Sequence, residues 1–184
     1  SESFSTTADV DQLDMGTSRI VSMANPLNPQ DAATKFYVDA VATGLDVKQS
    51  VRVLPTASLA AFTAAGAGVG ATLTAPTDSA THNTQDGVLL VVGNRVLVAT
   101  HGGAYTTPDT ENGIYTVFSL GNGAGTSLVL TRATDFDQDA EVTAGAFTFV
   151  TEGTANADTG WVLITNDPIV VDTTALQFSQ FSTA

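Results

Sequence analysis

The chain of 184 residues contains no cysteine. This absence excludes disulfide frameworks, catalysis by a thiolate and zinc sites built on cysteine. Basic residues are scarce, with 6 Lys and Arg against 19 Asp and Glu. Nucleic-acid binding needs clustered Lys and Arg, so the composition argues against a nucleic-acid partner and against an anionic membrane surface. The sequence also lacks any apolar run that approaches the ~20 residues of a membrane-spanning helix.

What the chain does contain is acidic charge and strand-forming residues. The formal net charge is −13, and charged residues make up only 14% of the chain, against about 25% in an average domain. The acidity concentrates in residues 53–184, which hold two basic and twelve acidic residues. Abundant Thr, Val and Gly favour strands joined by turns. The length predicts one domain, here with a small additional element, and we interpret the acidity as favouring solubility.

Residues 1–45 are predicted to form an extended arm, a short strand at Arg19–Met23 and a connector helix over residues 29–43. Asn28 suits the N-cap of this helix and Pro29 its first position. A helix this short must pack on something, either its own β-domain or copies of itself around a symmetry axis. Its apolar residues recur at a/d-like spacing in two adjacent lines, formed by Ala33, Tyr37 and Ala40 and by Val38, Val41 and Leu45.

From residue 46 to 184 the pattern changes to short runs with a period of two. This pattern predicts a mainly β fold, with an antiparallel β-sandwich or barrel-like domain after the N-terminal strand and helix. Gly93-Asn94 predicts a tight hairpin turn, and the Ala-rich stretch Ser58–Ala65 fits one short helix. The candidate strands are Val47–Leu54, Ala71–Thr74, Gly87–Val92, Arg95–Thr100, Gly113–Phe118, Ser127–Ala133, Ala146–Thr151, Gly160–Thr165 and Leu176–Phe181.

The segment Asp135–Glu141 has the alternating acidic residues of a calcium loop. Ala140 stands where an EF-hand needs Gly, and Ala146 where it needs Glu, so this segment is not an EF-hand. A different cation site built from Asp135, Asp137 and Asp139 stays open beside a solvated turn. The sequence shows no Gly-x-Ser-x-Gly elbow for a hydrolase. We therefore predict no catalytic site, no cofactor and no firm metal site, and expect the chain not to be an enzyme.

Two blocks of the sequence carry extended motifs, and together they cover most of residues 15–181. The first block is Met15-Gly16-x-x-Arg19-Ile20-Val21-x-Met23-Ala24-Asn25-Pro26-x-Asn28-Pro29-Gln30-Asp31-Ala32-Ala33-Thr34-Lys35-x-Tyr37-Val38-Asp39. The second includes Asp86-Gly87-Val88-x-Leu90, Gly93-Asn94-Arg95-Val96-Leu97-Val98, Glu111-Asn112-Gly113-Ile114-Tyr115, Thr131-Arg132-Ala133-Thr134-Asp135 and Asn156-Ala157-Asp158-Thr159-Gly160-Trp161.

Both blocks resemble bacteriophage tail fibre proteins, although Phe36 and the inserts at residues 66–81 and 121–126 depart from the usual pattern. The resemblance implies a homotrimeric virion protein of the phage tail fibre that acts as a scaffold or adaptor in host attachment. Its implied partners are further copies of itself through the six helix positions above, other tail or baseplate proteins, and a host surface glycan or protein. Two alternatives stay open: a glycan- or receptor-binding module whose loops present His101, Tyr105 and Trp161, and a less favoured capsule depolymerase. Such fibres continue beyond the point matching Phe181, so we expect a fragment or the ordered part of a longer fibre.

Overall fold

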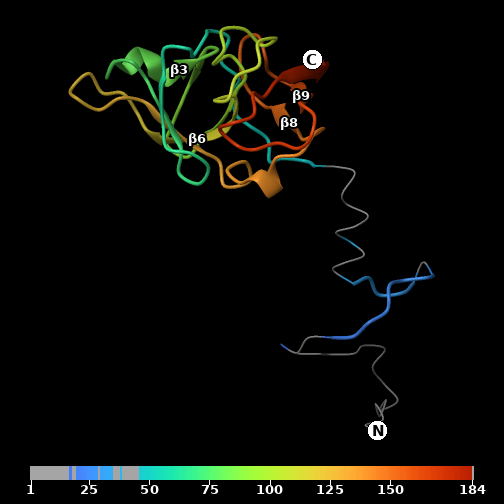
Figure 1. The fold of residues 1–184 in the computed structure, drawn as a ribbon. Coiled ribbons are helices and arrows are strands. Elements are labelled where there is room, and N and C mark those ends of the chain that lie inside the picture. Colours follow the sequence, from blue (N-terminus) through green and yellow to red (C-terminus); the bar gives the residue numbers. More distant parts are fainter. Residues whose placement is uncertain (1–16, 18–19, 29, 35–37, 39–45, 184) are drawn as a thin grey trace, which may run out of the picture. The chain divides into compact units, whose positions relative to one another are not determined.

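The structure is a computed structural model that describes residues 17, 20–28, 30–34, 38 and 46–183. The chain divides into two units, residues 1–44 and residues 45–184. Figure 1 shows that the strands lie in the second unit, which we call the β-domain.

The β-domain consists of short antiparallel strands in three sheets. A five-stranded sheet has the order β1-β2-β7-β6-β5, a three-stranded sheet the order β10-β9-β8, and β3 pairs with β4. This confirms the mainly β, antiparallel class, although the described strands form no closed barrel. The strands are β1 Thr63–Ala65, β2 Thr72–Thr74, β3 Thr84–Gln85, β4 Val88–Leu89, β5 Arg95–Val98, β6 Gly113–Ser119, β7 Val129–Arg132, β8 Phe147–Val150, β9 Thr159–Leu163 and β10 Phe178–Ser182, with 3-10 turns η1 Ala80–Asn83 and η2 Asp139–Glu141.

The five-stranded sheet buries apolar side chains on both faces, because successive residues of a strand point to opposite sides. On β5, Val96 and Val98 belong to one hydrophobic cluster, whereas Leu97 belongs to the other. The cluster that holds Leu97 also contains Trp161 and Leu163 of β9. This second cluster therefore joins the five-stranded and the three-stranded sheets.

The segment Val47–Leu54 connects the two larger sheets. Val51 forms a parallel bridge to Val150 of β8, and Val53 forms a parallel bridge to Val96 of β5. The strand predicted over this segment is therefore present as isolated bridges, because its two ends pair with strands of different sheets. Val51 and Val53 are fully buried and belong to the two different clusters, so the segment also links the cores.

The hairpin predicted at Gly93-Asn94 is wrong. β4 pairs with β3, and β5 pairs with β6. The Gly93 N–H donates to the carbonyl of Val117 at 2.9 Å, and the Val117 N–H donates to the carbonyl of Asn94 at 2.9 Å. A tight turn is present at residues 91–94, where the Asn94 N–H donates to the carbonyl of Val91 at 3.1 Å, but it leads from one sheet to another. The hairpin turn lies at Asp86-Gly87 between β3 and β4, where both residues have positive φ (45° and 78°), as a type I′ turn requires.

The prediction of a short helix at Ser58–Ala65 is also wrong. The end of this segment forms β1, which pairs with β2. The turn between the two strands contains Gly66, Gly68 and Gly70, whose φ angles are +82°, +62° and +82°. Residues with a side chain rarely adopt such angles. The Gly68 N–H donates to the Asp172 carboxylate at 2.5 Å, which fixes the turn against the C-terminal loop.

In the N-terminal unit, the predicted strand and connector helix are not confirmed. Residues 20–23 form no strand, and residues 30–34 form no helix. Val38 has helical backbone geometry, and its N–H donates to the carbonyl of Thr34 at 3.0 Å, the spacing of a helical bond. Residues 29, 35–37 and 39–43 of the predicted helix lie outside the described residues.

The turn before the predicted helix is held by the Asp31 carboxylate. It accepts hydrogen bonds from the N–H groups of Leu27 at 2.9 Å and Asn28 at 2.8 Å, and these bonds lower the pKa of Asp31. A bond from an acid back to the N–H of the residue three positions earlier is one half of a capping box. These bonds hold a turn at Asn28–Asp31, after which residues 32–34 form no helix.

A buried ion pair ties β7 to the C-terminal loop. Arg132 Nε donates to Asp172 Oδ1 at 2.7 Å, and the two side chains are 0% and 6% exposed. The other guanidinium nitrogens donate to the carbonyls of Thr110 at 2.9 Å and Asn112 at 3.3 Å. The guanidinium also lies 4.9 Å from the centre of the Tyr115 ring. These contacts compensate the buried charge of Arg132.

Candidate functional site

The strands of the three-stranded sheet contain no charged residue, although the chain has a net charge of −13. The strand sequences FTFV of β8, TGWVL of β9 and FSQFS of β10 contain no Asp, Glu, Lys or Arg. Burial alternates along β8. Trp161 and Leu163 of β9 and Phe178 of β10 join the core, whereas Phe149, Val162 and Phe181 are exposed or half-buried. In Figure 1, β8, β9 and the C-terminal strand lie together on one side of the β-domain.

Aromatic and aliphatic side chains form rows across the outer face of this sheet. Phe147 of β8 lies opposite Val162 of β9, which lies opposite Ser179 of β10. In the next row, Phe149 lies opposite Gly160. The alternation of the strands therefore presents Phe147 and Phe149 on the same side of β8.

Phe181 of β10 completes a triangle of aromatic rings. Its ring centre is 5.8 Å from that of Phe147 and 5.8 Å from that of Phe149, and the latter two are 6.1 Å apart. The rings meet edge to face, which is a favoured geometry for aromatic pairs. A Cβ atom on Gly160 would lie 2.5 Å from the Phe181 ring, so the glycine makes room for this ring.

The aromatic triangle is open to solvent. Phe149 is 45% exposed and Phe181 is 51% exposed. Phe147, Val162 and Phe181 line a shallow apolar hollow of about 260 Å³. Contiguous apolar side chains on a protein surface mark interaction sites, so this surface is the candidate functional site of the chain.

The candidate site lies where the first described residues of the β-domain begin. The Phe147 N–H donates to the carbonyl of Asp46 at 2.9 Å, and the Lys48 N–H donates to the carbonyl of Phe147 at 2.8 Å. Val47, between these residues, bridges to Phe147 and is 57% exposed. We call the surface formed by Val47, Phe147, Phe149, Val162 and Phe181 the phenylalanine face.

The sequence argument did not predict this face, although a signal for it is present. Phe147 and Phe149 are separated by one residue, which places both on one side of any strand. Phe178 and Phe181 are separated by two residues, and the irregular register between Gln180 and Ser182 of β10 turns Phe181 outward. A bulge of this kind leaves little trace in a sequence.

Trp161, which we predicted as a possible ligand-facing residue, lies in the core. It is 3% exposed, and its Nε1 donates to Thr159 Oγ1 at 2.9 Å. Its ring centre is 5.0 Å from that of Tyr105, a second predicted ligand-facing residue. The Tyr105 hydroxyl donates to the carbonyl of Pro55 at 3.1 Å and accepts from Asn156 Nδ2 at 3.0 Å. The structure brings these two rings together, with Trp161 facing inward.

His101, the third predicted ligand-facing residue, has a separate set of partners. Its Nδ1 is 2.9 Å from Asp109 Oδ1, and its Nε2 is 3.2 Å from the carbonyl oxygen of Phe62. The backbone N–H of His101 donates to Asn112 Oδ1 at 3.1 Å. With both ring nitrogens in contact with protein atoms, His101 fixes the loop between β5 and β6.

The three aspartates considered for a cation site serve different neighbours. Asp135 Oδ2 accepts from Arg95 Nη2 at 2.9 Å, and Asp139 Oδ1 accepts from the Val171 N–H at 2.9 Å. Asp137 is 4% exposed, and its Oδ1 has no hydrogen-bond partner in the described structure. Within the described part of the chain, no group of three or more Asp, Glu or His side chains is arranged to hold a metal ion.

The Asp137 carboxyl should make the stability of the β-domain depend on pH. Its burial, and then the nearby Glu141 carboxylate, raise the pKa of Asp137 above its ordinary value of 3.8. The folded state therefore holds this proton at pH values where the unfolded chain has lost it. The free energy of unfolding contributed by this group is highest below about pH 4 and falls as the pH rises through the raised pKa.

We expect Asp137→Asn to stabilise the protein at pH 7, because the amide carries no buried charge. The gain should shrink toward pH 4, and urea unfolding at pH 4, 5.5 and 7 measures it. Asp158→Asn, at an exposed residue, is the control and should show no such trend. A variant that is less stable than the wild type at pH 7 would contradict the assignment.

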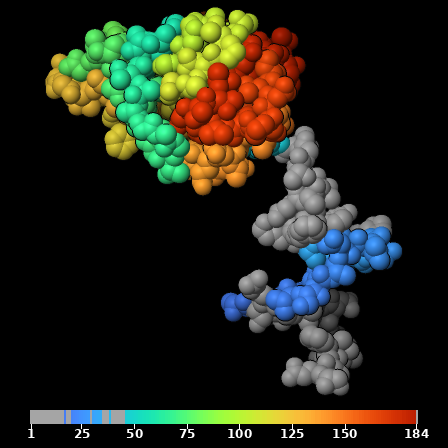
Figure 2. All heavy atoms as spheres, in the orientation of Figure 1, coloured from blue at the N-terminus to red at the C-terminus, as the bar shows by residue number. Residues whose placement is uncertain are grey.

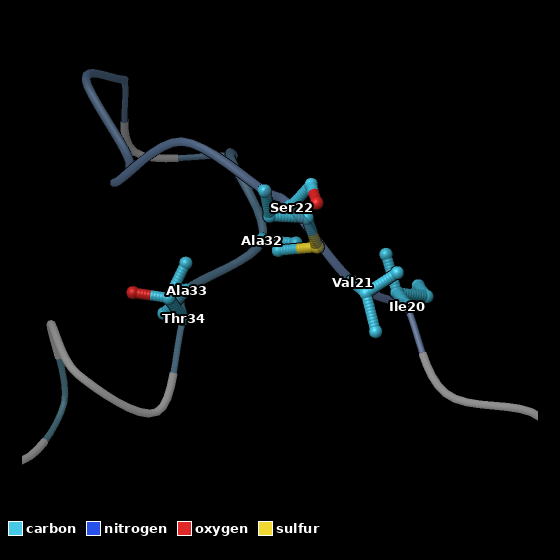
Figure 3. Close-up of a pocket in the computed structure, with 7 residues that line it drawn as sticks. Ile20, Val21, Ser22, Ala32, Ala33 and Thr34 are labelled. Carbon is cyan, nitrogen blue, oxygen red and sulfur yellow. The ribbon is translucent and has the colours of Figure 1, made fainter.

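The residues predicted as oligomer contacts lie in the N-terminal unit, where the structure describes two of the six. Ala33 and Val38 are exposed to solvent, whereas the other four, Tyr37, Ala40, Val41 and Leu45, lie outside the described residues. In Figure 3, Ser22 and Ala32 overlap at the centre, with Ile20 and Val21 on one side and Ala33 and Thr34 on the other. Between them lies an open hollow of about 540 Å³.

Comparisons with protein-family models, with curated proteins and with solved structures find no match to this chain. The likeness to tail fibre proteins therefore stays a prediction from the residues quoted above. In the part of the chain that the structure describes, none of the helices has the length and hydrophobicity that crossing a bilayer requires.

Proposed function

We propose that the chain is a structural component of a phage tail fibre, located in the virion, and that it acts as a homotrimeric scaffold or adaptor in host attachment. The observation that carries the proposal is the motif of residues 15–39, in which 20 of the 25 positions carry the resemblance to the connector segment of such fibres. The proposed architecture is a connector helix over residues 29–43 followed by a sandwich-like β-domain.

Features of the described structure support this proposal. The turn at Asn28–Asp31 is bonded as at the start of a helix, and Val38 presents an exposed apolar side chain. An isolated helix of this length is marginal in water, so association of copies along its apolar lines would stabilise it. The β-domain adds an exposed apolar surface that suits contact with another protein.

Light scattering of the purified chain should give about three times the monomer mass of 18.8 kDa. Val41→Asp should convert this species to monomers, because it places a charge on the apolar line of the predicted helix. Ala32→Asp adds the same charge at a position that is not three or four residues from any of the six predicted contact residues, and should leave the mass unchanged. A wild-type chain that stays monomeric at micromolar concentration would contradict the proposed trimer.

A further inference from the structure

The segment Val47–Leu54, which we call the linking segment, lies beside β8 in the position of a fourth strand of the three-stranded sheet. It is joined to β8 by parallel bridges, Val47 with Phe147 and Val51 with Val150. β8 is antiparallel to β9, and β9 is antiparallel to β10. The linking segment and β10 therefore run in the same direction, at the two edges of one sheet.

Because of this direction, the linking segment begins and β10 ends at opposite ends of the sheet. Val47 lies in the row of Phe147, at the start of β8. Ser182, at the end of β10, pairs with Gly160, which pairs with Phe149 in the second half of β8. In Figure 1 the C label lies at the upper edge of the β-domain, and Figure 2 shows the darkest red atoms, those of the C-terminal end, at the same edge. A pull that separates these two points is directed along the strands.

The hydrogen bonds of the linking segment lie across such a pull, because ladder bonds connect neighbouring strands side by side. Sliding the segment along β8 has to break these bonds together, whereas peeling it from one end breaks them one after another. The bonds run from N–H to carbonyl at N···O distances of 2.8–3.0 Å, from Phe147 to Asp46, Lys48 to Phe147, Val51 to Phe149, Thr151 to Val51 and Glu152 to Arg52.

The second half of the linking segment is also anchored to the five-stranded sheet. The Arg52 N–H donates to the carbonyl of Arg95 at 2.9 Å, and the Leu97 N–H donates to the carbonyl of Val53 at 3.1 Å. Val53 and Leu54 are 0% exposed and belong to the two different hydrophobic clusters. The segment therefore cannot slide without exposing apolar surface of both cores to water.

We propose that the β-domain is a load-bearing module, in which the linking segment holds the fold against tension directed along the strands. Resistance to force is set by the rate of unfolding. Shear raises the barrier to unfolding, because hydrogen bonds and buried contacts have to give way in one step. The inference deepens the proposed function and rests on it for the source of the tension, since a fibre that attaches a particle to a host transmits pulls between them.

Forced unfolding of single full-length chains tests this role through the direction of pulling. One handle is attached at the N-terminus and the other at one introduced cysteine, because the chain has no native cysteine. Ala155→Cys places the second handle at the far end of the linking segment, where the neighbouring Asn156 Nδ2 donates to the carbonyl of Leu54 at 3.1 Å. A pull between these handles loads the linking segment in shear along β8.

Ala144→Cys is the matched variant, with its handle at the near end of the linking segment. The neighbouring Thr143 Oγ1 donates to Asp46 Oδ2 at 2.8 Å, so a pull from this point peels the segment from its first residue. Ala144 and Ala155 are both exposed, so the two substitutions should leave the free energy of unfolding equal. Urea unfolding of both variants measures this.

At one loading rate, we expect the unfolding force to be higher by about twofold or more with Ala155→Cys than with Ala144→Cys. Handles at the N- and C-termini of the unchanged chain also load the sheet along its strands, and should give a force close to that of Ala155→Cys. Equal forces in the two cysteine variants, or a higher force for Ala144→Cys, would overturn the inference.

The outcomes separate this inference from the proposed function. A chain that forms trimers in light scattering, but unfolds at the same force in both directions, would overturn the load-bearing role and leave the proposed trimer standing. A chain that stays monomeric, but resists shear more strongly than peeling, would support the load-bearing role and contradict the trimer.

Discussion

Replacement of Arg132 by methionine is expected to lower the free energy of unfolding by about 3–5 kcal/mol, as is typical when one partner of a buried ion pair is removed. The change leaves the Asp172 carboxylate, which is 6% exposed, without its cation. It also leaves the carbonyls of Thr110 and Asn112 without their donors. Urea unfolding followed by circular dichroism measures the loss.

Two further variants isolate the cause of this loss. Adding Asp172→Asn to Arg132→Met should recover part of the stability, because the uncompensated charge is gone. Asn also tolerates the positive φ of 59° at this position. Arg52→Met breaks the more exposed pair with Glu152 and should cost about 1 kcal/mol or less. Equal losses for Arg132→Met and Arg52→Met would contradict the role assigned to burial.

Phe136→Ala should produce a loss of similar size, about 3–5 kcal/mol, because it removes a fully buried ring and leaves a cavity. Phe136 is 0% exposed and belongs to the cluster shared by the two larger sheets. Its ring is 6.2 Å from that of Phe178, centre to centre, and lies against Gly113. The cavity would therefore open within the cluster that joins the two larger sheets.

The same unfolding assay measures the Phe136→Ala variant against Phe118→Ala. Phe118 is 69% exposed, so its truncation should change the free energy of unfolding by about 0.5 kcal/mol at most. A cost below about 1 kcal/mol for Phe136→Ala would show that the site repacks and that the shared cluster does not hold the sheets together.

Strands with clear alternation were predictable from local sequence. The runs at Arg95–Thr100 and Gly113–Phe118 match β5 and β6 closely, because Val, Leu, Ile and Tyr there alternate between two cores. Pairing was not predictable in the same way. Asn94 is a turn residue, as its sequence indicates, but its carbonyl also continues the β5–β6 ladder, so the turn joins two sheets and not the strands of one hairpin. The turn type depends on which strands meet, and that choice is made by contacts distant in sequence.

At the candidate site, too, residue type alone did not predict which side chains are buried and which are exposed. Trp161, Tyr105 and His101 were singled out by residue type, because aromatic and imidazole side chains often contact ligands. The structure uses Trp161 as a core residue and commits both ring nitrogens of His101 to protein partners. Phe149 and Phe181, which residue type would place in the core, are instead exposed.

Composition and periodicity by themselves determined that this acidic, cysteine-free chain has a mainly β domain with antiparallel strands. These properties follow from local preferences, since alternating apolar residues and Gly-rich turns act over a few neighbouring positions. Only the tertiary structure decided that the segment Val47–Leu54 joins two sheets and that a buried Arg132 compensates Asp172. It also decided which phenylalanines remain outside. The physical reason is that burial depends on which segments pack together, and paired segments lie up to 100 residues apart in the sequence, as Val47 and Phe147 do.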